Sequence, residues 1–100
     1  MNRVRIDGQL CELGALRLTP AGVAVIEFRL RHDSEQTEAR TSRKVNAEIP
    51  AIAFDAEARL LAGRALDTAL VVEGFLAARS RRSKKLVLHA QTIEFKENER

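Results

Sequence analysis

The sequence has little of several residue types, and each scarcity excludes a class of protein. A single cysteine, Cys11, allows no disulfide within the chain. With only two histidines, the chain also lacks the Cys/His clusters of zinc sites, so we expect no metal and no other cofactor. No stretch approaches the roughly 18 uncharged apolar residues of a membrane span, and residues 2–7 carry three charges where a signal peptide is apolar. We expect a cytoplasmic protein that does not contact membranes.

Aromatic residues are scarce as well, with four phenylalanines and neither tyrosine nor tryptophan. Proteins that hold single strands mainly by stacking need a series of aromatic side chains, so extensive base stacking is excluded. The remaining composition, 45% hydrophobic and 31% charged over 100 residues, is that of a globular chain long enough for one modest core. We expect a single domain over residues 1–100.

Positive charge is concentrated in one short segment. The chain has 17 basic and 14 acidic residues, a net charge of +3. Five of the basic residues fall within seven positions, and without them the balance would be −2. A nearly neutral body with one dense basic segment indicates a local contact with a polyanion. The five residues are Arg79, Arg81, Arg82, Lys84 and Lys85.

Apolar and polar residues alternate over residues 3–10, 24–32 and 44–54, the period of half-buried strands. Gly8 in the first of these segments indicates a bend or bulge. Pro50 in the third indicates an edge position or a bulge, because proline cannot donate a ladder hydrogen bond. The sequence therefore predicts three strands in its first half.

The segments between and after these strands have other patterns. Residues 19–22 carry proline and glycine at tight-turn positions and predict a hairpin. Residues 33–43 are polar and without period, so we expect a long loop of the kind that often binds ligands. Residues 55–62 predict a short helix, with Asp55 as its N-cap and Gly63 as its terminator.

Two further strands are predicted in the second half. Residues 69–78 are apolar except near Glu73 and Gly74, which is typical of a strongly bent strand in a small barrel. Residues 86–95 alternate with a change of phase near Gln91 and Thr92, which indicates a bulge.

An all-β chain of five strands, with one short helix between the third and fourth, has the element order of the OB-fold barrel. This fold commonly binds oligonucleotides through its second and third strands and through the loops that join strands one to two and four to five. The basic segment falls in the four-to-five loop. A basic run can be a solvated hairpin tip, but this position favours phosphate binding by its five cations.

A second set of polar side chains should lie on the outward face of strands two and three or in neighbouring loops. Glu27 and Glu48 share that face, so cross-strand ion pairing is a sufficient explanation for about half of the set. The residues on the face are Arg29, Arg31, Lys44 and Asn46, and those in the loops are Arg17, Arg40 and Arg43.

The phenylalanines fall into two groups. Phe28 and Phe75 lie within apolar strand patterns, and we expect both in the core. Phe54 and Phe95 lie at element ends, where stacking on a base is possible, but a packing role is the favoured interpretation. We expect packing roles for His32 and His89 too.

No arrangement of catalytic residues is present in the sequence. A phosphate-cradling glycine loop, a Ser/His/Asp set and an isolated carboxylate pair are all lacking. Cys11 at the end of the first strand is better explained as a small buried residue than as a nucleophile. We expect a binding protein and not an enzyme.

Several blocks of the sequence carry a family resemblance. They are residues 14–22, 25–30 and 32–35, the run Gly74-Phe-Leu-Ala77, and the run from Leu86 to Glu94 with Leu88-His-Ala90 inside it. Together they resemble the primosomal replication protein N family of bacterial single-stranded DNA-binding proteins. The resemblance implies a homodimeric OB-fold protein that binds single-stranded DNA and has no catalytic activity. It also implies that the protein assists the primosomal helicase at stalled forks, alongside other primosome loading proteins.

Two features qualify this resemblance. The five residues after Phe95 include neither a long linker nor the acidic apolar tip of general single-strand-binding proteins, so we expect an accessory role. Asn46 and Thr41 stand where relatives can carry aromatics, so we expect electrostatic DNA binding. Two alternatives remain, a general single-stranded DNA or RNA module and a protein–protein adaptor without strong nucleic-acid binding.

Overall fold

Six strands and one short helix make up the part of the chain that the structure describes, residues 1–96 of a computed structural model. The elements are β1 (Val4–Leu13), β2 (Arg17–Leu18), β3 (Ala24–Glu38), β4 (Thr41–Phe54), α1 (Ala56–Leu61), β5 (Ala69–Ala78) and β6 (Leu86–Phe95). Residues 97–100, which complete the predicted domain, lie outside the described residues.

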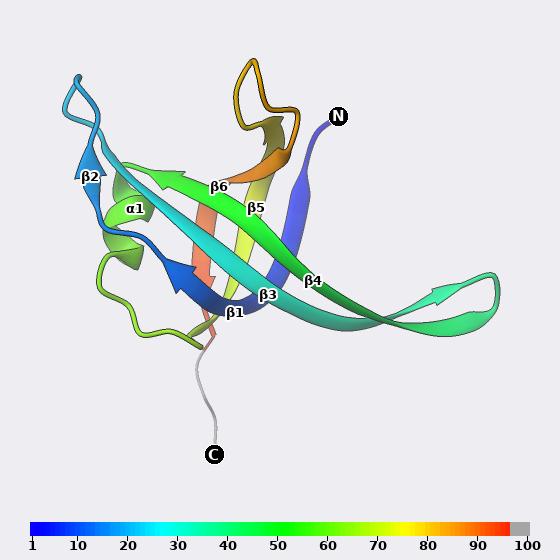
Figure 1. Ribbon diagram of the computed structural model, residues 1–100. Helices are drawn as coiled ribbons and strands as arrows, with labels where there is room; N and C mark the ends of the chain where they lie inside the picture. Colours follow the sequence, from blue (N-terminus) through cyan, green and yellow to red (C-terminus); the bar gives the residue numbers. More distant parts are fainter. Residues whose placement is uncertain (97–100) are drawn as a thin grey trace.

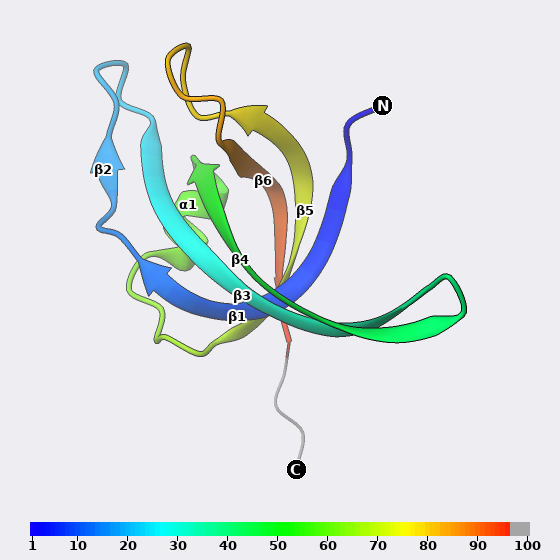
Figure 2. The same cartoon turned by 45° about the vertical axis from the view of Figure 1, so that its right-hand side comes forward.

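The five long strands close into a barrel (Figures 1 and 2). The sheet order is β1-β5-β6-β4-β3-β2, and a further pairing of β1 with β3 closes the ring. The β4–β6 pairing is parallel and the others are antiparallel. Helix α1 lies between β4 and β5, the third and fourth strands of the barrel. The predicted OB-fold is confirmed. Within residues 1–96, no helix is both long and apolar enough to cross a membrane.

The core follows from the alternation along the strands. Leu10, Ile26 and Leu30 are fully buried, as are Leu70 and Leu88 from the second half of the chain. The buried face of α1 adds Ala58 and Leu61 to the same cluster. Burying an aliphatic side chain of this size stabilises the fold by about 1.5–3 kcal/mol relative to leaving it exposed.

The bend predicted in β5 and the bulge predicted in β6 are one irregularity in their pairing. Glu73 pairs with Thr92 but Gly74 pairs with Ala90, which leaves Gln91 as the extra residue. At this point the backbones approach so closely that a Cβ on Gly74 would lie 1.8 Å from the carbonyl oxygen of His89. The glycine is therefore required by the bulge.

The irregularity predicted at Gly8 lies three residues further along β1. The pairing of β1 with β3 shifts between Leu10 and Glu12, which leaves Cys11 unpaired in the ladder. Gly8 is needed for close approach instead, because a Cβ there would lie 2.6 Å from the Arg31 carbonyl oxygen. Pro50 has the predicted edge character, since β4 pairs with β6 only over residues 51–53.

The prediction of a loop over residues 33–43 is wrong, because β3 and β4 continue through this segment as a paired hairpin. Pairing runs to Glu38 and Thr41, and the turn uses Ala39 and Arg40 at φ values of 51° and 65°. We call residues 33–46 the arm. It projects beyond the barrel (Figure 1), so both of its faces meet water and no apolar period marks it as strand.

Helix α1 begins and ends close to the predicted positions, but Asp55 does not cap it. Asp55 occupies the N-cap position at φ 57°, and its side chain makes no capping hydrogen bond. The left-handed backbone turns the carboxylate away from the first helical N–H groups. The end is as predicted, with Gly63 at φ 76° just beyond the helix.

Candidate nucleic-acid interface

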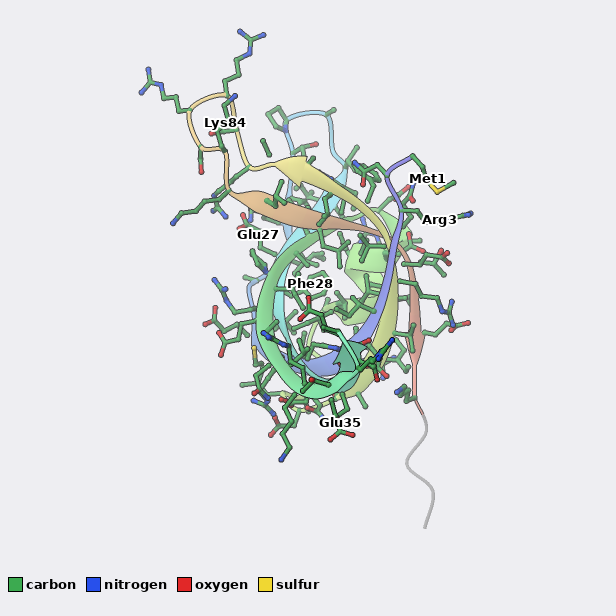
Figure 3. All side chains as sticks on the ribbon, turned by 90° about the vertical axis from the view of Figure 1, so that its right-hand side faces the viewer. Met1, Arg3, Glu27, Phe28, Glu35 and Lys84 are labelled. Atoms are coloured by element: carbon green, nitrogen blue, oxygen red, sulfur yellow. The ribbon has the colours of Figure 1, made fainter. Side chains whose placement is uncertain are left out.

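Residues 79–85, which we call the basic loop, join β5 to β6 as a short closed turn. The N–H of Arg79 donates to the Lys85 carbonyl over 2.8 Å, and the N–H of Ser83 donates to the Ser80 hydroxyl over 3.0 Å. Figure 3 shows the loop, in which Lys84 is labelled, standing clear of the barrel. Its ordered backbone therefore presents the cations to solvent.

Four of the five predicted phosphate-binding cations of this loop have no carboxylate partner among residues 1–96. All four are exposed, and within residues 1–96 none makes an ion pair. They are Arg81, Arg82, Lys84 and Lys85. Side chains that are not engaged inside the molecule can neutralise phosphates without first breaking a contact.

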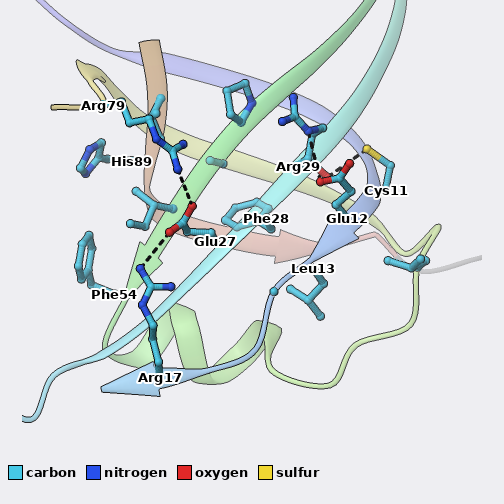
Figure 4. A pocket seen from close by; sticks show the side chains of 16 residues that line it. Cys11, Glu12, Leu13, Arg17, Glu27, Phe28, Arg29, Phe54, Arg79 and His89 are labelled. Atoms are coloured by element: carbon cyan, nitrogen blue, oxygen red, sulfur yellow. Dashed lines mark hydrogen bonds and ion pairs between the residues drawn. The ribbon is translucent and has the colours of Figure 1, made fainter. Parts of the chain in front are cut away.

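Arg79 differs from these four, because it shares a carboxylate with Arg17. The Arg17 Nη2 lies 2.9 Å from one oxygen of Glu27, and the Arg79 Nη2 lies 3.5 Å from the other (Figure 4). Glu27 belongs to the outward face of β3. The connection from β1 to β3, which contains β2 and Arg17, lies at the same end of the barrel as the basic loop (Figures 1 and 2). The Glu27 carboxylate therefore joins both connections to the sheet.

The predicted row on β3 and β4 shares one face. The register pairs Arg29 with Pro50 and Arg31 with Glu48 on the barrel, and pairs Glu35 with Lys44 on the arm. Asn46, opposite Asp33, donates to its carboxylate. The face therefore runs continuously from the barrel onto the arm.

The arginines of this face do form ion pairs, but not with the predicted partners. Arg29 lies 3.6 Å from Glu12, and Arg31 lies 3.2 Å from Asp67. On the opposite face of the arm, Arg43 lies 3.1 Å from Glu38. Exposed pairs of this kind contribute only about 0–1 kcal/mol, so a phosphate can replace the carboxylate at little cost.

A groove of about 860 Å³ lies between the two loops and the outer face of the sheet. Its lining includes Arg17, Glu27, Arg29, Phe54, Arg79 and His89 (Figure 4). The volume is within the roughly 300–1,000 Å³ of ligand sites. The groove was not predicted from the sequence, although one signal was present. After Ile49 every residue of β4 is apolar, so the outward face of this strand changes from charged to apolar.

Cys11 lines the same groove as a thiol. Its Sγ donates to the Arg29 carbonyl oxygen over 3.4 Å. Burial raises the pKa of Cys11 above its ordinary value, with Glu48 adding to the increase. The thiolate that a nucleophile requires is therefore disfavoured.

One of the two phenylalanines predicted in the core lies outside it. Phe28 is 4% exposed and is in the core as predicted. Phe75 is not in the core: it is half-buried on the outer face, where its ring stacks on His89 with the centroids 4.8 Å apart. Phe95 packs against the core and has the guanidinium of Arg64 over its ring at 3.9 Å.

The position of Glu27 leads to a first prediction. The carboxylate occupies two arginines that face the groove and repels phosphate, so Glu27→Gln should tighten binding of oligo-dT several-fold at low salt. Each arginine released to a phosphate should steepen the slope of log K against log salt by about 0.7. Fluorescence anisotropy titrations at several salt concentrations measure both quantities.

Glu73→Gln is the matched control, because Glu73 also lies near two arginines, Arg3 and Arg5, at 3.8 Å each. It contributes nothing to the groove lining, so its loss should leave affinity nearly unchanged. Weaker binding by Glu27→Gln would mean that Glu27 positions the two arginines for DNA instead of competing with it.

Comparisons with known proteins show the family of this chain. A family model described as "Another single-strand binding protein family" matches residues 2–92. The replication restart protein PriB of Bordetella pertussis is 42% identical over 91 residues, which cover 91% of this chain and 85% of that protein. PriB of Nitrosomonas europaea is 37% identical over 90 residues, covering 90% and 83%.

Solved structures give the same result. PriB from Ralstonia solanacearum superposes with a TM-score of 0.86 at 33% identity, covering 97% of this chain and 99% of that one. The single-stranded DNA binding protein from Thermus aquaticus reaches 0.77 at 21% identity, covering 97% and 50%, which shows the shared fold alone. The chain therefore belongs to the PriB family of replication restart proteins, within the single-strand DNA-binding proteins.

Proposed function

We propose that residues 1–100 act as one OB-fold domain, an accessory protein of the replication-restart primosome that binds single-stranded DNA and assists the primosomal helicase. One observation carries the DNA-binding site. Four cations without ion pairs within residues 1–96 stand on an ordered loop beside the groove, where OB-folds receive oligonucleotides. The name of the relatives, replication restart protein PriB, supports the restart role.

The basic loop provides the main phosphate contacts in this proposal. Arg81 and Arg82 offer planar donor forks to phosphate oxygens, and Lys84 and Lys85 add mobile point charges. Phosphate contacts carry no sequence information, so the protein accepts any single strand, as an accessory at arbitrary fork positions requires.

The outward face of β3 and β4 extends this path toward the arm. Where the DNA strand crosses the barrel, Arg29 and Arg31 exchange their ion pairs with Glu12 and Asp67 for contacts with phosphates. Lys44 and Asn46 continue the contacts on the arm, and Arg43 adds a cation on the opposite face of the arm.

Unwinding of a forked DNA by the family's cognate primosomal helicase tests the accessory role. Wild-type protein should increase the unwinding rate, and an Arg81→Ala/Arg82→Ala variant should increase it less. Competition between oligo-dT and oligo-U tests the class of ligand. Equal competition without any effect on the helicase would identify a general single-strand module, and undetectable binding of either at low salt would identify a protein adaptor.

We propose a homodimer as the working form. Over residues 4–6, β1 pairs with β5 on one side and has no strand on the other within residues 1–96. An open edge of this kind favours pairing with another chain, and a twofold dimer would place two basic loops along one DNA path. Multi-angle light scattering should report twice 11.2 kDa; a species of 11.2 kDa alone at micromolar concentrations would contradict the dimer.

A further inference from the structure

Phe54 is the one exposed ring among the four phenylalanines, all of which lie within the described residues. It is 39% exposed at the end of β4, whereas Phe28 is buried, Phe75 is half-buried and Phe95 is packed against the core. An exposed phenylalanine contributes little to the core. Its position at a functional groove therefore calls for another explanation.

Phe54 ends a row of three nearly parallel rings across β4, β6 and β5. Its ring stacks on His89 with centroids 6.2 Å apart and an interplanar angle of 22°. His89 in turn stacks on Phe75 at 4.8 Å and 14°. His89 and Phe75 are half-buried, so Phe54 is the most exposed ring of the row.

Charges that suit a nucleotide surround this ring. Figure 4 shows Phe54 and His89 facing the same groove as Arg17 and Arg79. A flat apolar surface beside two guanidinium groups matches the two parts of a nucleotide, the base and its phosphate. A phosphate alone would leave the exposed ring without a role.

We propose that Phe54, supported from behind by His89 and Phe75, is a base-stacking subsite for single-stranded DNA. The proposal rests on the proposed function, since the strand must first be drawn to the groove by the basic loop. One base adds a fourth ring to the row, and its phosphate lies toward Arg17 and Arg79. This single subsite replaces the extensive stacking that the aromatic content excludes.

The absence of tryptophan and tyrosine makes a direct test possible. Phe54→Trp introduces the only indole of the chain, and a base stacked on it should quench its emission when oligo-dT binds. Phe95→Trp is the matched control, because that ring packs on the core beneath Arg64. Its emission should not change. Quenching in both variants or in neither overturns the proposal.

Affinity gives a second readout. Removing one stacking contact costs roughly 1–3 kcal/mol, so Phe54→Ala should weaken oligo-dT binding by about 5- to 100-fold with an unchanged salt slope. Phe54→Leu, which keeps apolar bulk without a flat ring, should weaken binding similarly and guards against unfolding of the alanine variant. Circular dichroism and melting temperatures establish that each variant is folded.

An abasic oligonucleotide separates stacking from a structural effect. It has the phosphates but no bases, so wild type and Phe54→Leu should bind it equally. If the variant loses affinity for the abasic strand as well, Phe54 acts on the fold and the proposal fails. If Phe54→Leu binds oligo-dT like wild type while Arg81→Ala/Arg82→Ala does not, stacking fails but the proposed function stands. If wild type binds no oligo-dT, both fail.

Discussion

Replacing Arg81 and Arg82 together by alanine should weaken binding of every single-stranded DNA by about 25-fold at 0.1 M salt. Each phosphate contact contributes a slope of about −0.7 in log K against log salt. Two lost contacts therefore remove about 1.4 log units of affinity between 1 M and 0.1 M salt and make the slope shallower by the same amount. Anisotropy titrations with oligo-dT, oligo-dA and mixed sequences should give equal losses.

The fold should not change in this variant, because exposed loop substitutions usually alter stability by less than about 0.5 kcal/mol. Arg59→Ala is the control, since it removes an exposed positive charge from α1 and should alter the affinity little. Unchanged affinity and slope in the double variant, or a loss confined to one base sequence, would mean that the basic loop is not a phosphate site.

Replacing Gly74 by alanine should destabilise the fold strongly. The added Cβ would lie 1.8 Å from the carbonyl oxygen of His89 and 2.9 Å from its carbonyl carbon. Both atoms belong to the backbone of β6, so the β5–β6 ladder has to separate to accept the methyl group. We expect a loss of about 4 kcal/mol or more, which is a large part of a total stability of roughly 5–15 kcal/mol. The melting temperature should fall by more than about 15 °C.

Gly22→Ala is the matched control. Gly22 has a φ of 84°, which is strained for alanine, but nothing lies within 4 Å of the position of its Cβ. It should lose only about 1–2 kcal/mol, the cost of a left-handed alanine. Similar losses in the two variants would show that the close approach at the bulge does not require a glycine at position 74.

The barrel could be predicted because its strands have one buried face. Alternation marks residues such as Ile26 and Leu30, and breaks in it mark the bulge at Gln91. The match to the PriB family confirms the resemblance found in the sequence. It also confirms the expectation of a DNA-binding protein that is not an enzyme. The arm could not be predicted, because its strands are exposed on both faces and no period separates them from a loop.

The position of the basic loop could be predicted, because charge is a property of sequence; that the loop binds phosphates stays a prediction. The ion-pair partners could not be predicted, because they depend on how distant segments of the chain meet. Arg31, for example, pairs with Asp67, far along the chain, and not with Glu48 opposite it. The row of Phe54, His89 and Phe75 crosses three strands in the spatial order β4-β6-β5, which differs from their order in the sequence. Only the barrel topology brings such residues together.

The salt dependence of single-strand binding by the unmodified protein tests the central claim most directly. Labelled oligo-dT should be titrated at salt concentrations from 50 to 400 mM, roughly the range over which phosphate contacts weaken. If Arg81, Arg82, Lys84 and Lys85 all neutralise phosphates, log K should fall linearly with log salt, with a slope of about −2.8 or steeper. A slope between zero and about −0.7, the value for a single contact, would contradict an electrostatic interface built on the basic loop.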